Sequence, residues 1–345
     1  MTPSRVSRTT TRLLCVTAAL TMVFAAASCE SDGGSPGTPD GFVSGADVGP
    51  QAYNERRDLS ALFDVPGVDA QTNPPEGYIP TGATDLQIEA LRRVNWYRWK
   101  AGLPVVDLDN AISEAAQKHC ECYVAHSGEW TISPHSENPS WGEPCRGESM
   151  IERIDAAGGS TGAGASEVIA FETTPTRAVD GWMDTLYHRV PILDPSARFC
   201  GYGEVIEGLS KTINTMDFVV GDTVADREGI HLYPYDGQTD VPTSWNGYES
   251  PQPPEPPNGY PSGPIVTLTL GKGGWMGETH ELFNEVGDPV EHTYLDQYND
   301  DHLQGWNTVA IYANEPLDPD ATYQVHIRIN DSGAPRSIRW SFTTR

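Results

Sequence analysis

Hydrophobic residues follow two different periods along this chain of 345 residues, and a proline-rich stretch separates them. Between residues 84 and 187, apolar side chains recur every three or four positions, which is the period of an amphipathic helix. After residue 264 they alternate with polar ones, as Tyr323, Val325, Ile327 and Ile329 do, which is the period of a half-buried strand. Two periods predict two differently built domains, and the length is sufficient for two.

Four helices are expected in the first region, each beginning at a residue that caps or starts a helix. These starts are Thr84, with Gln87 at capping-box spacing, then Asp109, Ser149 and Thr174-Pro175, the last helix running to about Tyr187. Strand-like segments lie between and after them, at 167–170, 202–206 and 212–220. Helices around a small sheet predict an α-β-α sandwich within an α+β chain.

The first thirty residues have the layout of an export signal. Three arginines precede an apolar run from Leu13 to Ala27, and small residues follow. The stretch from Ala25 to Cys29 resembles a bacterial lipobox, although Ala26 stands where leucine is usual. The resemblance implies a signal peptide over residues 1–28, acyl chains on Cys29, and a lipidated N-terminus and flexible tether over 29–83. Ordinary secretion is the alternative.

The charge balance argues against nucleic acid as a partner. The chain carries 22 Lys and Arg against 48 Asp and Glu, a net charge of -26. Removal of the signal takes three arginines and no acid, which deepens the charge from -26 to -29. Such a surface repels nucleic acid and anionic headgroups. We therefore expect membrane attachment through a lipid anchor only, and a small ligand, a lipid or an envelope protein as partner.

Four cysteines lie outside the signal run and the lipid site: Cys120, Cys122, Cys145 and Cys200. An even number in an exported chain predicts two disulfides, with three connectivities open. Cys120 and Cys122 are poorly placed to pair with each other on a helix. Each is therefore expected to reach Cys145 or Cys200.

A series of short motifs runs in a fixed order through residues 84–222. They are Asn95-x-Tyr97-Arg98, Ala115-Ala116-x-x-His119, His135-Ser136-Glu137, Ser166-Glu167-Val168-Ile169, Trp182-x5-His188-Arg189 and Gly201-Tyr202-Gly203. Together they resemble the CAP superfamily of cysteine-rich secretory proteins, antigen 5 and pathogenesis-related proteins, in its bacterial SCP-like form. The resemblance implies a CAP α-β-α sandwich over residues 84–225.

The same resemblance implies a surface cavity lined by histidines and acids, which in some members holds a divalent metal. His135 matches the first histidine, Glu167 the first acid, and His188 the histidine of bacterial members. Thr185 stands where the second acid is usual. The resemblance thus implies a ligand-binding site at His135, Glu167 and His188. A divalent metal such as zinc would be held by His135 and His188.

Motifs for enzymatic chemistry are few. The chain has no HExxH helix and no Gly-x-Ser-x-Gly elbow, so no residue is assigned as catalytic, and a non-enzymatic binding role is favoured. The alternative is a metal-assisted hydrolase that uses His135, Glu167 and His188, with Glu148 or Glu152 nearby. His119 lies on an apolar helix face and is expected to be buried. Trp130 and Trp141 bracket His135, which suggests that they edge the cavity.

The C-terminal part is expected to begin after a proline-rich, extended linker over residues 226–264. Candidate strands at 265–270, 308–312, 323–329 and 338–343, with turn residues between them, predict a small antiparallel β-sandwich over residues 265–345. The run from Glu315 to Tyr323, closed by Trp340-Ser341-Phe342, resembles bacterial Ig-like domains of surface proteins. That resemblance implies a spacer or adhesive module.

Overall fold

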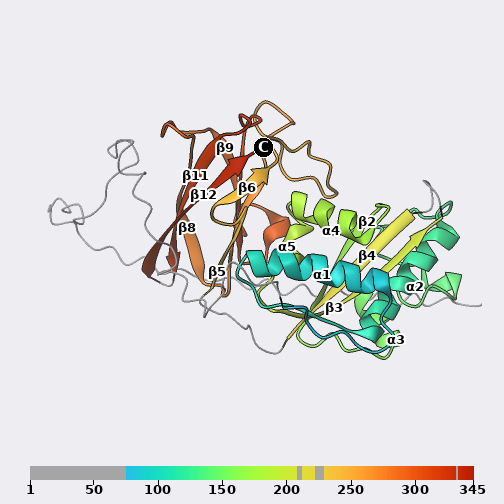
Figure 1. The fold of residues 1–345 in the computed structure, drawn as a ribbon. Coiled ribbons are helices and arrows are strands. Elements are labelled where there is room, and N and C mark those ends of the chain that lie inside the picture. Colours follow the sequence, from blue (N-terminus) through green and yellow to red (C-terminus); the bar gives the residue numbers. More distant parts are fainter. Residues whose placement is uncertain (1–74, 208–211, 222–228, 332) are drawn as a thin grey trace, which may run out of the picture. The chain divides into compact units, whose positions relative to one another are not determined.

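The structure is a computed structural model that describes residues 75–207, 212–221, 229–331 and 333–345. The expected signal peptide, Cys29 and nearly all of the tether lie outside these residues. A sheet flanked by helices is followed by two further sheets (Figure 1). No helix in the described part of the chain is both long and apolar enough to cross a bilayer.

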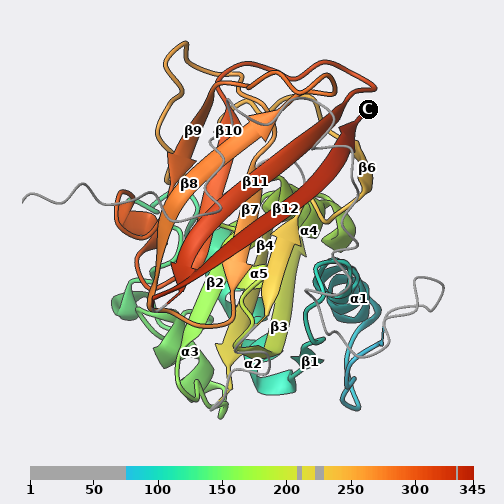
Figure 2. The same cartoon turned by 90° about the vertical axis from the view of Figure 1, so that its left-hand side faces the viewer.

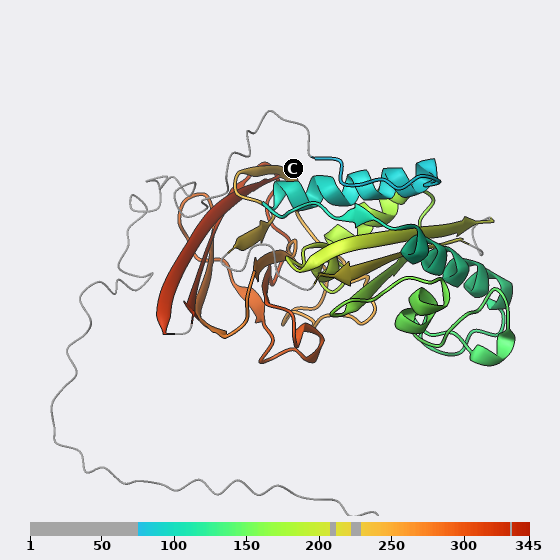
Figure 3. The ribbon, with the colours of Figure 1, turned by 90° about the horizontal axis from the view of Figure 1, so that it is seen from below.

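The first sheet has the strand order β1-β3-β4-β2. Its strands are β1 (Asp107–Leu108), β3 (Ala197–Ile206), β4 (Thr212–Val220) and β2 (Ala165–Ala170). Side chains alternate between the two faces along each strand. On β4, Met216 and Phe218 share a core with α1 (Asp85–Lys100) and α4 (Pro175–Asp184). Ile213 and Val219 pack on the other side with α2 (Asn110–His126) and α3 (Met150–Ala156). The layers of this α-β-α sandwich are visible in Figure 3.

The four expected helix starts are confirmed. Thr84 and Ser149 form capping boxes, Asp109 accepts from two backbone N–H groups, and Thr174 caps α4 with Pro175 in its first turn. The fourth helix ends at Asp184 instead of Tyr187, because the chain becomes extended at Thr185. A short helix, α5 (Arg189–Ile192), follows.

Two glycines in β3 set how closely α2 lies on the sheet. A Cβ atom on Gly201 would lie 2.2 Å from the Ser113 nitrogen, and one on Gly203 would lie 2.3 Å from the Gln117 nitrogen. Any side chain at these positions would push α2 away from the sheet, because protein cores are already close-packed. The Gly-Tyr-Gly motif is therefore a packing requirement.

Two four-stranded sheets form the C-terminal part, with the orders β5-β7-β10-β9 and β6-β12-β11-β8. Their strands are β5 (Ile230–Tyr233), β6 (Gln238–Val241), β7 (Val266–Leu270), β8 (Trp275–Phe283), β9 (His292–Leu295), β10 (Thr308–Ala313), β11 (Thr322–Asp331) and β12 (Ala334–Thr344). Apolar residues of both sheets meet in one core. Figure 2 shows β8, β11 and β12 side by side. The α+β class is confirmed, and the four expected strands are β7, β10, β11 and β12.

The stretch expected to be an extended linker is packed onto these sheets. It contains β5 and β6, which pair with β7 and β12. Pro253 and Pro256 are buried, and the Tyr260 hydroxyl donates to the carbonyl of Pro253 at 3.1 Å. Prolines cannot donate backbone hydrogen bonds, but their carbonyls still accept them, so a proline-rich segment can be anchored by tyrosines.

The first sheet region and the C-terminal sheets share an apolar cluster. Leu186 and Val190 pack in it with Ile265 and Tyr312. The buried Arg189 guanidinium donates to the carbonyls of Met183 and Ile265, at 2.7 and 2.8 Å. Residues 75–345 therefore belong to one compact unit.

Candidate functional site

A buried network of charges lies between the first sheet and the α2–α3 layer. The Arg153 guanidinium, fully buried, donates to Glu167 Oε2 and, at 3.1 Å, to the carbonyl of His135. Its Nε lies 3.9 Å from Glu137 Oε1. The Arg146 and Gly147 N–H groups donate to the other Glu137 oxygen. One buried cation thus compensates two buried carboxylates.

His119 also belongs to this network. The ring is fully buried, with Nδ1 2.9 Å from Glu137 Oε1 and Nε2 2.9 Å from the carbonyl of Pro134. Both nitrogens are used by protein partners, so His119 holds the 133–137 loop against α2. The expectation of a hydrogen-bonded core histidine is confirmed.

His135 and Glu167 form a pair, as the CAP resemblance implied. His135 Nδ1 lies 2.8 Å from Glu167 Oε1, and the His135 side chain is 41% exposed while Glu167 is 4% exposed. Burial alone raises the pKa of Glu167, but the hydrogen bond from His135 and the charge of Arg153 outweigh it and lower this pKa to about 2. An ionised carboxylate only accepts hydrogen bonds. His135 therefore carries its proton on Nδ1 and presents the Nε2 edge of its ring outward.

Asp217 faces the same network from β4. It pairs directly with Glu167 across β2 and β4 and is fully buried. Burial, and then the charge of Glu167, raise the pKa of Asp217 well above its usual value. Two neighbouring buried carboxyls cannot both ionise cheaply, so one keeps its proton. Asp217 is the neutral member of this pair.

Replacing Asp217 by asparagine should change how stability depends on pH. In the native protein Asp217 keeps its proton above the pH at which the unfolded chain loses it, so stability falls as pH rises through that window, by up to about 1.4 kcal/mol per pH unit. Asp217→Asn removes this loss. Urea unfolding should show a gain over the native chain that grows from pH 4 upward; a pH-independent difference would contradict the assignment.

His188 does not join His135 and Glu167. Its Nδ1 lies 2.8 Å from Oε1 of Glu249, a fully buried side chain from the proline-rich stretch. The same carboxylate accepts from the backbone N–H groups of Leu186, Tyr187 and His188, at 2.9, 2.7 and 3.0 Å. Glu249 therefore holds His188 at the start of α5, and among the described residues the ligand atoms of His135, Glu167 and His188 do not gather within 4.8 Å of one another.

The residues present do not fit a zinc site. Both oxygens of Glu167 are taken, by His135 and by the cationic Arg153. Among the described residues, one group of three metal-ligating side chains has ligand atoms within 4.8 Å of one another: Cys122, Glu137 and Cys145. The two sulfurs of that group are joined in a disulfide. Glu152 is occupied in the α3 capping box.

The expectation of two disulfides is also corrected. Cys122 and Cys145 are bonded, whereas Cys120 and Cys200 are free and buried. Positions two apart on a helix point to different sides, so Cys120 faces the sheet, where its sulfur contacts Thr215 Oγ1 at 3.3 Å. Cys200 lies in the core on the opposite face of that sheet. The sheet itself separates the two thiols.

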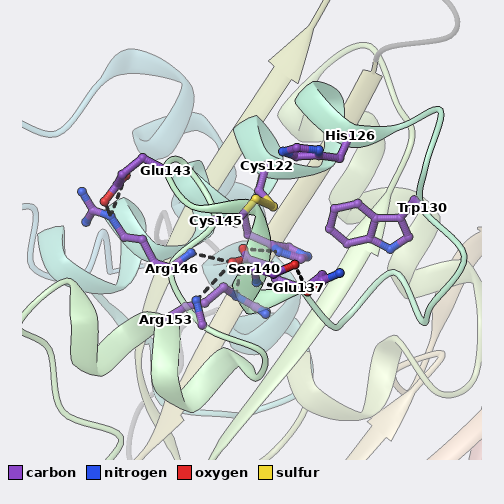
Figure 4. Close-up of a disulfide and its surroundings, with 12 residues drawn as sticks. Cys122, His126, Trp130, Glu137, Ser140, Glu143, Cys145, Arg146 and Arg153 are labelled. Atoms are coloured by element: carbon purple, nitrogen blue, oxygen red, sulfur yellow. Dashed lines mark hydrogen bonds and ion pairs between the residues drawn. A yellow bond between two sulfur atoms is a disulfide. The ribbon is translucent and has the colours of Figure 1, made fainter.

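Five rings make an aromatic surface on and around the loop that carries His135: Tyr123, His126, Trp130, Trp141 and Phe171. Trp130 lies 4.9 Å from Tyr123 and 5.0 Å from Trp141 between ring centroids. His126 stacks on Trp141 at 4.4 Å, and Phe171, 55% exposed, lies 5.7 Å from Tyr123. Figure 4 shows Trp130 and His126 near the Cys122–Cys145 disulfide, with Glu137 and Arg153 below them. Trp130 and Trp141, which the sequence suggested as residues at the edge of the binding site, thus share this surface with three further rings.

A separate cleft of about 420 Å³ has no residue of this site in its lining. It lies between Ser166 of β2, the Asp194–Ser196 turn and the segment from Gln304 to Thr308. Ser166 and Glu167 are neighbours on a strand and point to opposite faces. The cleft and the His135–Glu167 pair are therefore on different sides of the sheet, and Trp306 is the indole that lines the cleft.

Sequence reasoning missed three residues of the buried network, which are Arg153, Asp217 and Glu137 as a charge partner, and it missed Glu249, the partner of His188. In the sequence, Arg153 is one polar residue on a short helix. Asp217 interrupts a strand that is otherwise apolar. The aspartate in the otherwise apolar run from Met216 to Val220 was the available signal, because acids are rarely buried without a partner.

Comparison with known proteins identifies the first region. Residues 91–217 match the protein family described as CAP, the cysteine-rich secretory protein family, and this part of the chain is a CAP domain. A search of curated proteins returned no match.

Two solved structures are similar to parts of this chain. One is an extracellular protein containing a SCP domain from Bacillus anthracis str. Ames, at 19% identity and a TM-score of 0.32, covering 39% of this chain and 40% of that one. The other is an outer surface protein from Borrelia burgdorferi, at 17% identity and a TM-score of 0.30, covering 38% and 88%. The chain spans less than half the length of the first.

Proposed function

We propose that this protein is exported and lipid-anchored at the cell envelope, and that its CAP domain binds a ligand without chemical turnover. The two C-terminal sheets serve as an Ig-like spacer or adhesive module. The anchor rests on the lipobox-like stretch ending at Cys29. A Cys29→Ser variant should leave the membrane fraction, and its continued membrane association would refute the anchor.

The observation that carries the binding role is the aromatic surface. Its rings are partly exposed yet held in place: the Trp130 indole N–H donates to the carbonyl of Ser133 at 3.1 Å, and the disulfide ties α2 to the loop after Trp141. The buried Glu137 network fixes the loop from beneath. Rigid aromatic side chains give a large contact area at a small cost in conformational entropy, which suits a preformed binding surface.

The chemistry of the surface favours a saccharide of the envelope. Ring faces stack on the C–H faces of sugars, and the exposed carboxylate of Glu129, 3.9 Å from His126 Nδ1, accepts hydrogen bonds from hydroxyl groups. This carboxylate and the net charge of -26 repel anionic lipid headgroups. His135, 41% exposed on the loop between Trp130 and Trp141, offers one more polar group to a ligand.

The metal-assisted hydrolase is the weaker candidate. It requires His188 beside His135 and Glu167, and His188 is instead held by Glu249. Glu167 accepts from His135 at Oε1 and from Arg153 at Oε2, which leaves neither carboxylate oxygen free for a metal. Non-enzymatic binding does not require these residues to hold a metal, so it fits the observed contacts of His188 and Glu167 better than hydrolysis does.

Co-sedimentation with purified insoluble cell-wall glycan tests the proposal. The Cys29→Ser protein, which lacks the proposed lipid anchor, should pellet with the glycan and stay in solution with phosphatidylglycerol vesicles. Truncating a buried aromatic anchor typically costs 2 kcal/mol or more, so a Trp130→Ala/Trp141→Ala variant should bind about 30-fold or more weakly. Trp99→Ala, a partly exposed tryptophan on α1, is the matched control and should bind normally. Equal binding by both variants, or no binding by the Cys29→Ser protein itself, would overturn the proposal.

A further inference from the structure

The outer face of the sheet β6-β12-β11-β8 brings three chemically complementary side chains together. On β11, Val325 and Ile327 point into the core, so His326 between them points outward. Glu281 of β8 is its direct partner in the strand register. Ser337 of β12 is its diagonal neighbour, because His326 pairs directly with Arg339. The sheet register thus places Glu281, His326 and Ser337 in a row across β8, β11 and β12, the strands that lie side by side in Figure 2.

The row has a defined direction of hydrogen bonding. His326 Nδ1 lies 2.8 Å from Glu281 Oε2, and His326 Nε2 lies 2.8 Å from Ser337 Oγ. A carboxylate only accepts, so Nδ1 carries the ring proton and Nε2 accepts from the serine hydroxyl. His326 is 7% exposed, whereas Ser337 is exposed. The orientation is that of a nucleophile, a base and an acid that orients the base.

We propose that Ser337, His326 and Glu281 form a serine-esterase site that cleaves esters of short acyl groups such as acetyl. Ser337 Oγ attacks the ester carbonyl carbon while its proton moves to His326 Nε2, and that proton then passes to the departing alcohol. Water, deprotonated by His326, attacks the acyl–serine, which releases the carboxylic acid and restores Ser337. Ser337 and His326 are the catalytic residues, and Glu281 is a positioning residue. The exposed Ser337 hydroxyl on the outer sheet face can be reached by a small acyl group such as acetyl.

The surroundings of the row support this assignment. Burial, and then the charge of Arg339, lower the pKa of His326, so the imidazole is neutral and able to take a proton near pH 7. Arg339 and Arg328 lie on the same outer face, as the direct register partners of His326 and Ser337. Guanidinium groups there would stabilise the oxyanion of the tetrahedral intermediate. This site is separate from the CAP domain and does not depend on the binding function proposed above.

Labelling of the full chain with a fluorophosphonate probe, together with hydrolysis of p-nitrophenyl acetate, tests the site. The label should map to Ser337, and Ser337→Ala or His326→Gln should lower the Ser337-dependent hydrolysis about 100-fold or to background. Ser341→Ala, on the same strand and face, is the matched control and should keep both signals. Absence of label on Ser337 in the folded native chain, or equal hydrolysis by native chain and Ser337→Ala, would overturn the proposal.

The positioning role of Glu281 is tested by a measurement that would stay unchanged if Glu281 only stabilised the sheet. In Glu281→Gln the imidazolium loses its anionic partner, so the rise of kcat/KM with pH should shift to lower pH while the maximum falls. A variant that only weakened the sheet would lower the maximum and leave the midpoint unchanged. An unchanged midpoint would remove Glu281 from the site.

Discussion

Replacing Arg153 by methionine is expected to lower the free energy of unfolding by about 3–5 kcal/mol, because the change strands buried carboxylates without their cation. Arg153 is fully buried and contacts Glu167, Glu137 and the carbonyl of His135. Arg92→Met is the matched control. Arg92 pairs with Glu76 on the surface, where both side chains are at least half exposed, and its loss should cost less than about 1 kcal/mol.

A second substitution distinguishes two causes of the stability loss in Arg153→Met: the uncompensated charge of Glu167 and the lost packing of the arginine side chain. Adding Glu167→Gln to Arg153→Met removes the carboxylate that the first change leaves uncompensated, so part of the stability should return. Denaturant unfolding of the two single variants and the double variant gives the coupling between the side chains. A double variant as unstable as the sum of the single changes would show that charge compensation is not what Arg153 provides.

Removing the disulfide is expected to have the second-largest effect on stability. Cys122 and Cys145 close a loop with a sequence separation of 23 residues, and loop-closure entropy for this length corresponds to about 3 kcal/mol. The Cys122→Ala/Cys145→Ala variant should lose about that much under oxidising conditions. Thermal and urea unfolding with and without dithiothreitol measure it.

The reductant supplies the control for this prediction. Dithiothreitol should destabilise the native chain toward the level of the double variant and leave the variant itself unchanged, because Cys120 and Cys200 are free thiols. Sensitivity of the variant to dithiothreitol would mean that these two thiols are bonded in solution, which the structure contradicts.

The helices were predictable because their signals are local. Thr84, Asp109, Ser149 and Thr174 act on N–H groups two or three residues away, and the sequence alone contains that information. The strand β8 was missed because its pattern is irregular: within it, Trp275, Leu282 and Phe283 are buried and the residues between them are not. Burial of β8 depends on strands that follow it in the chain.

The site was only half predictable, for a related reason. His135 and Glu167 were found through motif order. Their relation to Arg153 and Asp217 depends on which faces of a helix and a sheet meet. The same holds for His188, whose partner Glu249 lies 61 residues later in a proline-rich stretch that has no helical or strand period. The predicted number of disulfides was wrong because a count of cysteines does not tell which face of the sheet each one occupies.

The central claim is that the CAP domain binds its ligand at the aromatic surface, and the indole N–H signals in an NMR titration test it most directly. The Cys29→Ser protein would be titrated with soluble fragments of cell-wall glycan. We predict shifts at Trp130 and Trp141, with the signals of Trp99 and of Trp306 in the separate cleft unchanged. Shifts confined to Trp306, or none at Trp130 and Trp141 under conditions where the glycan binds, would contradict the account.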